Sequence, residues 1–177
     1  MKIVREIEIT ATSVLLDGQP VQVQQSGEKM LVELYRRYAG DYPKFFKMDT
    51  LSRLGFIAAE MLLKIEDPKD ENALPSAIIL ANRSASIKND RDYLATISEG
   101  NYYPSPALFV YTLPNIVTGE IAIRHHIQGE TSFYILESPQ QLDAIIASTP
   151  FESALAGWCE CSTKDNFYAK LQLIWNN

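Results

Sequence analysis

The chain has 177 residues, of which 46% are hydrophobic and 21% charged, the mixture typical of a globular domain with a sizeable core. Acidic residues outnumber basic ones by 22 to 16, which gives a net charge of −6. This balance argues against nucleic-acid binding, and against an acidic partner unless lysines and arginines cluster locally. The apolar runs are too short for a membrane span, and the charged N-terminus is unlike a signal peptide, so we expect a cytoplasmic protein.

The N-terminal segment predicts a β-hairpin. Residues 3–16 are rich in Ile, Val and Thr and partly alternate with polar residues, which predicts one strand. Asp17-Gly18 is a turn signal, because both residues tolerate the positive φ of tight hairpins. Val21 and Val23 alternate with glutamines, which predicts the returning strand.

Two helices are expected next. The first covers 27–39, with Ser26 as its cap and Gly40 as its stop. The second covers 49–64 and is apolar on most of its surface, which predicts a largely covered helix.

The middle of the chain predicts a buried strand and a further helix. Residues 76–81 (SAIILA) form a short continuous apolar run, typical of a strand that is buried on both faces. A helix is expected over 90–98, capped by Asn89 or Asp90.

The segment that follows contains a helix and an apolar strand. A loop with two prolines leads to a helix for which Thr112 is the predicted cap, with Pro114 and Asn115 in its first turn. Gly129 ends that unit, and the apolar strand 131–136 follows.

The C-terminal part predicts a short helix and two further elements. The helix covers 139–148, with Ser138 as its cap. A strand is expected over 154–161, and residues 167–175 form either a strand or a short helix. Strands and helices alternate without a linker, so we predict a single α/β domain over 1–177.

One motif resembles a known family. Asn115, Gly119, Ala122-Ile123-Arg124 and Gly129 are similar to the N-x-x-x-G-x-x-A-I-R-x-x-x-x-G signature of β-ketoacyl (3-oxoacyl-ACP) synthases, which have the thiolase fold. Weaker similarities are KMD at 47–49, SAIILANRSAS at 76–86 and SALAG at 153–157. The resemblance implies the N-terminal half of that fold, a thiolase-like half-fold with a mixed sheet flanked by helices.

The resemblance also places Ser138 at the position of the family's nucleophilic cysteine. Condensation needs a thiolate and two histidines, and the family carries those histidines in its second half. The only histidines here, His125 and His126, fall near the end of the predicted 121–127 helix, and the chain ends at Asn177. We therefore expect a protein without stand-alone condensing activity. The alternative is an acyltransferase or thioester hydrolase that uses Ser138.

The cysteines and histidines do not have the spacing of a metal site. Cys159 and Cys161 share one face of a strand, but neither C-x-x-C nor H-x-x-x-H is present. We expect reduced thiols, a solvated or locally hydrogen-bonded histidine pair, and no metal or cofactor.

The composition of the helix 139–148 indicates whether this chain needs the second half of the thiolase fold to cover it. In the thiolase fold the corresponding helix is buried from all sides, whereas Gln140, Gln141 and Asp143 cannot be buried cheaply without partners. We expect these side chains to meet water and the chain to stand as a half-fold.

The strand 131–136 is the predicted contact surface for a partner chain. Thr131, Phe133 and Ile135 lie on a β-prone edge, and the resemblance implies that this strand pairs with its twin across a dimer axis. We expect a homodimer, or a heterodimer with a full-length synthase, and an acyl carrier protein as a further partner. The implied role is an accessory one in fatty-acid or polyketide-type biosynthesis, including polyene pigments.

An aromatic loop allows a third function. Residues 102–111 include Tyr103, Phe109 and Tyr111, which are candidates for binding an acyl chain or another small ligand. The other interpretation is that these rings anchor the loop or belong to the core.

Overall fold

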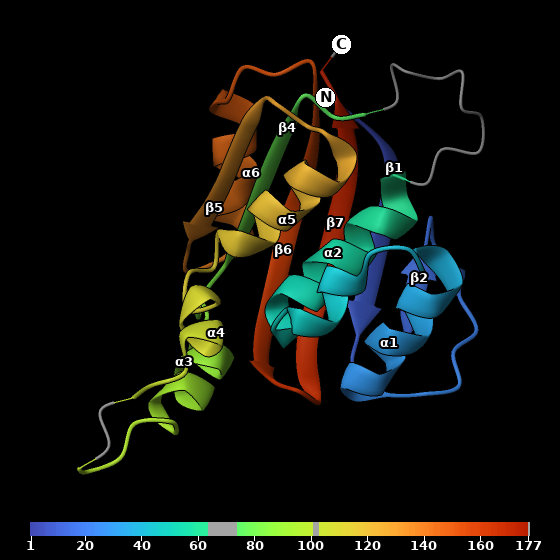
Figure 1. Ribbon diagram of the computed structural model, residues 1–177. Coiled ribbons are helices and arrows are strands. Elements are labelled where there is room, and N and C mark those ends of the chain that lie inside the picture. Colours follow the sequence, from blue (N-terminus) through green and yellow to red (C-terminus); the bar gives the residue numbers. More distant parts are fainter. Residues whose placement is uncertain (64–73, 101–102, 177) are drawn as a thin grey trace.

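The computed structural model describes residues 1–63, 74–100 and 103–176, and these form one sheet with helices on both faces (Figure 1). The strands are β1 (Lys2–Thr10), β2 (Val14–Leu16), β3 (Gln19–Pro20), β4 (Ala77–Asn82), β5 (Glu130–Ile135), β6 (Ser153–Thr163) and β7 (Asn166–Trp175). The helices are α1 (Gly27–Tyr38), α2 (Thr50–Leu63), α3 (Ile87–Leu94), α4 (Pro106–Val110), α5 (Ile116–His125) and α6 (Pro139–Ser148), with a 3-10 turn η1 at Pro43–Lys47.

The sheet is mixed, as predicted, and its strand order is β3-β2-β1-β7-β6-β4-β5. β4 runs parallel to both β5 and β6, whereas every other pairing is antiparallel. β1 and β7, from opposite ends of the chain, are neighbours in the sheet. The parallel strands therefore lie at one end of the sheet, and β5 is its edge.

The larger core lies under α1, α2 and α5, which cover one face of the sheet (Figure 1). In α2, every residue except Arg53 is buried, which confirms the prediction of a largely covered helix. Gly55 allows α2 and α5 to approach closely, because a Cβ at this position would overlap a methyl group of Val117.

The opposite face is covered by α6. Leu142 and Ile146 of this helix pack on alanines and isoleucines of β4, β6 and β7. Gln140, Gln141 and Asp143 are exposed, as the sequence predicted. The polar side of α6 therefore meets solvent in this structure.

Most predicted elements are confirmed with small shifts at their ends. They include α1, β4, β5, α6 and β6. Residues 166–175 form a strand, which decides between the two alternatives left open for this segment. β4 is buried along its whole length, as its apolar sequence predicted. The predicted end of the second helix at residue 64, and residue 102 of the aromatic loop, lie outside the described residues.

The hairpin prediction is wrong in two places. The stretch 3–16 is two strands and not one, because the Thr10 hydroxyl accepts hydrogen bonds from the backbone N–H groups of Thr12 and Ser13 and turns the chain. The turn at Asp17-Gly18 is present, but the returning strand is only Gln19–Pro20 and does not include Val21 and Val23.

Two helix starts are also wrong. α3 begins at Ile87 with Ser86 as its N-cap, earlier than predicted. α5 begins after Asn115 and not after Thr112, and residues 106–110 form the separate short helix α4. Neither α2 nor another described helix has the length and apolarity needed to cross a membrane.

Candidate functional site

Ser138 lies where β5 leads into α6, at the carboxyl end of the parallel strands. Pro139 occupies the first helical position, which its fixed φ suits, and Ser138 is the N-cap. The side chain of Gln141 accepts hydrogen bonds from the backbone N–H groups of Glu137 at 2.7 Å and Ser138 at 3.2 Å. The predicted helix cap at Ser138 is therefore confirmed.

Two carboxylates lie at the same end of the sheet, and both have partners. Glu160 of β6 accepts a hydrogen bond from the Arg83 backbone N–H at 2.8 Å and another from the Ser84 hydroxyl. Glu137 forms an exposed ion pair with Arg83 at 3.1 Å. Across residues 1–63, 74–100 and 103–176, no histidine or carboxylate is hydrogen-bonded to the Ser138 hydroxyl. A serine without an adjacent base is a weak nucleophile.

The two histidines do not form a solvated pair, which corrects part of the prediction. His126 is exposed and ends α5 with a left-handed φ of 57°. His125 points inward, and its Nε2 lies 3.0 Å from Oε1 of Glu60 in α2. Arg124 contacts the same carboxylate at 2.9 Å and Asp41 at 2.6 Å.

The ion pairs around Glu60 join α2 to α5. Burial raises the pKa of the Glu60 carboxyl, but hydrogen bonds from Arg124 and the close contact with His125 outweigh burial and leave the pKa below its ordinary value. The carboxylate is thus held in its charged form by partners from a distant part of the sequence. No short motif signals such a contact, so sequence reasoning missed it.

The cysteines lie on one face of β6, as predicted, and both are buried. Burial raises the pKa of Cys159 well above its ordinary value and that of Cys161 to about 12. The thiolate is the reactive form, so burial disfavours reaction of these thiols in the folded chain. Within the described residues, no group of three or more His, Cys, Asp or Glu side chains is placed to hold a metal ion.

The aromatic candidates differ in their surroundings. Tyr103 is 89% exposed and Phe109 is 55% exposed, and the ring of Phe109 lies 5.4 Å from that of Tyr93. Tyr111 is only 8% exposed and belongs to the larger core. The three rings thus range from solvent to core, and their role in binding a ligand stays a prediction.

β5 presents one side to β4 and forms the end of the sheet on its other side. Phe133 packs against the larger core, whereas Ile135 is 51% exposed and Thr131 is exposed. An unpaired strand edge offers a row of backbone donors and acceptors to another chain. The geometry therefore provides the edge on which the predicted pairing depends.

The chain is similar to solved structures of ketosynthases. No family model matches it, and no curated protein matches it. A ketosynthase (ApeO) in complex with its chain length factor (ApeC) from Xenorhabdus doucetiae matches with a TM-score of 0.65 and 14% identity over 99% of this chain and 79% of that one. The ishigamide ketosynthase/chain length factor matches with a TM-score of 0.67 and 14% identity, over 98% of this chain and 61% of that one.

The chain has a ketosynthase-like fold. Similarity at 14% identity establishes the architecture, and it confirms the thiolase-like half-fold predicted from the signature around Gly119 and Gly129. The chain spans less than two thirds of the length of the ishigamide protein.

Proposed function

We propose that the protein is a non-catalytic, ketosynthase-like accessory subunit of fatty-acid or polyketide-type biosynthesis, including the building of polyene chains, in the cytoplasm. The observation that carries this proposal is a ketosynthase-like fold with Ser138 as a helix cap at the position that the family resemblance assigns to the nucleophile. The two similar structures each contain a ketosynthase with a chain length factor. A role beside a ketosynthase is therefore the simplest one for this chain.

The chemistry of the site supports a non-catalytic role. Acyl exchange in a ketosynthase requires a reactive thiolate, whereas Cys159 and Cys161 are buried and protonated. Ser138 has a helix-capping environment, and His125 is committed to Glu60. The residues that could supply a nucleophile and a base are thus dispersed or already engaged.

The proposed partner is a complete ketosynthase that pairs with the free edge of β5. Thr131 and Ile135 are exposed on this strand, and antiparallel addition of a second strand would satisfy the backbone groups of the edge. Self-pairing of two copies through β5 would use the same surface. The pathway's acyl carrier protein is a further partner that this role implies.

The pairing is tested by native mass spectrometry of the chain co-expressed with the ketosynthase of its own pathway. We expect a 1:1 complex that Ile135→Lys abolishes, because lysine on an edge strand opposes further pairing. Leu15→Lys is the matched control, since Leu15 is a half-exposed apolar residue on β2, near the opposite edge of the sheet. The proposal fails if no complex forms, or if both variants weaken it equally.

A further inference from the structure

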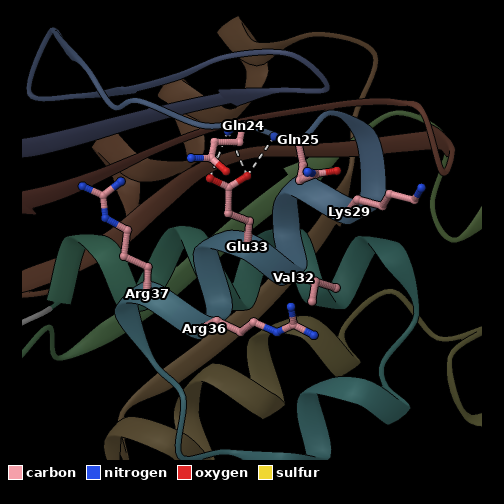
Figure 2. Close-up of a pocket in the computed structure, with 7 residues that line it drawn as sticks. All are labelled: Gln24, Gln25, Lys29, Val32, Glu33, Arg36 and Arg37. Atoms are coloured by element: carbon pink, nitrogen blue, oxygen red, sulfur yellow. Dashed lines mark hydrogen bonds between the residues drawn. The ribbon is translucent and has the colours of Figure 1, made fainter.

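A groove on the outer side of α1 carries a local excess of positive charge. It has a volume of about 630 Å³ and is lined by Gln24, Gln25, Lys29, Val32, Glu33, Arg36 and Arg37 (Figure 2). Three cations face a single carboxylate here, although the whole chain has a net charge of −6. This groove meets the condition under which an acidic chain can still attract an acidic partner, which is local clustering of its basic residues.

Hydrogen bonds to the backbone fix the wall of the groove. The carboxylate of Glu33 accepts bonds from the backbone N–H groups of Gln24 at 3.0 Å and Gln25 at 2.8 Å, as Figure 2 shows. The guanidinium of Arg37 donates to the carbonyl of Gln22 at 3.0 Å. The negative charge in the groove is therefore engaged in holding the wall, and the groove is formed before anything binds.

Lys29 and Arg36 are the cations available to a partner. Both side chains are exposed, and neither forms an ion pair with another described residue. They are seven residues apart on α1, so they lie on one face of the helix about 10 Å from each other along its axis. Val32 lies between them on the same face and is half-buried. The face thus has an apolar centre with a cation at each end.

We infer that this groove binds an acidic helical segment of a partner protein, with carboxylates about two turns apart and an apolar residue between them. The repeat of cation, apolar residue and cation along α1 matches such a segment laid alongside it. A single phosphate group would reach only one end of this face. Among the described residues, the lining contains no aromatic ring on which a nucleic-acid base could stack, which argues against a single-stranded nucleic acid.

The groove is independent of the proposed pairing edge. α1 packs on α2 toward the β1 end of the sheet, whereas β5 is the edge at the other end (Figure 1). A partner in the groove and a second chain on β5 therefore occupy separate surfaces. Loss of one interaction leaves the other intact, so the two assignments are tested separately.

The test uses a fluorescein-labelled, helix-forming peptide of Ala, Leu and Glu, with two glutamates seven residues apart, and a second peptide with glutamine in their place. Anisotropy titrations at low salt are expected to show saturable binding of the glutamate peptide only. The double variant Lys29→Glu/Arg36→Glu is expected to weaken binding about 10-fold or more, since each exposed pair is replaced by repulsion. Binding should also weaken as salt is raised.

The control is the double variant Arg91→Glu/Lys164→Glu, which changes the net charge equally. Arg91 and Lys164 are exposed and line a different surface groove. The inference is overturned by equal losses in both double variants, by absent or unsaturable binding of the glutamate peptide, or by equal binding of the glutamine peptide. Tight binding of duplex DNA that the Lys29→Glu/Arg36→Glu variant abolishes, and that displaces the peptide, would also overturn it. Circular dichroism confirms that each variant is folded.

Discussion

Replacing Gly129 by alanine is expected to destabilise the protein through a single steric contact. A Cβ at Gly129 would overlap the carbonyl oxygen of Ser76 and lie 3.0 Å from its carbonyl carbon. The φ of Gly129 is not in the left-handed region, so the penalty for alanine is one of space and not of backbone conformation. Overpacking costs about 1–3 kcal/mol, and we expect the upper half of that range because the obstacle is main chain at the start of β4.

Gly119 provides a matched control from the same signature. It lies inside α5, and a Cβ added there would meet no atom of the described residues within 4 Å. Alanine at such a helical position stabilises by roughly 0.5–1 kcal/mol relative to glycine. The two glycines of one sequence motif are therefore expected to respond to the same substitution with opposite signs.

Thermal unfolding followed by circular dichroism measures both effects. For a domain of this size 1 kcal/mol shifts Tm by about 2–4 °C, so Gly129→Ala is expected to lower Tm by roughly 4–12 °C and Gly119→Ala to raise it by roughly 1–4 °C. If Gly129→Ala unfolds at the wild-type temperature, the close passage of Gly129 against Ser76 is wrong. The pairing of Ala77 with Glu130, the residues directly after Ser76 and Gly129, would then be wrong as well.

The further predictions concern the described site and core. Glu60→Gln should destabilise by about 1.5–3 kcal/mol, as urea unfolding would show, because it removes the charged acceptor of Arg124 and the carboxylate beside His125. Folding lowers the pKa of Glu60, so the carboxylate stabilises the fold fully above the pKa that it has in the unfolded chain. This stabilisation is lost as the pH falls through the lower pKa of the folded chain. Wild type should therefore lose more stability than Glu60→Gln under acidification. Cys159 and Cys161 should react with a thiol reagent at pH 8 only after denaturant is added, and reaction in the native state would contradict their burial. A fluorophosphonate probe should leave Ser138 unlabelled, whereas labelling that Ser138→Ala removes would favour the acyltransferase or hydrolase alternative.

Local sequence patterns were enough to predict the helices and strands that are determined by their own residues. The apolar period of 49–64 and the continuous apolar run at 76–81 predicted α2 and β4, because burial on all sides requires those sequences. The Ser-Pro step at Ser138 predicted the start of α6, because serine caps a helix and the fixed φ of proline suits the first helical position. The turn after Thr10 was missed because a hydroxyl-to-backbone bond there competes with strand formation.

Contacts between distant segments were beyond sequence reasoning. β1 lies between β2 and β7, and nothing in the N-terminal pattern indicates pairing with the last strand of the chain. The contact of His125 with Glu60 and the groove on α1 likewise depend on how helices pack. The spacing of Lys29 and Arg36 was visible in the sequence, but its meaning required knowing that this face of α1 points outward.

The central claim is that this ketosynthase-like chain does not itself catalyse condensation. Mass spectrometry of a reaction containing only the purified chain, an acyl primer and carrier-bound malonyl groups tests it most directly. We predict no 3-oxoacyl product above the level of a reaction that lacks the chain, and no difference from Ser138→Ala. Formation of that product by the chain alone, and its loss in Ser138→Ala, would contradict the account.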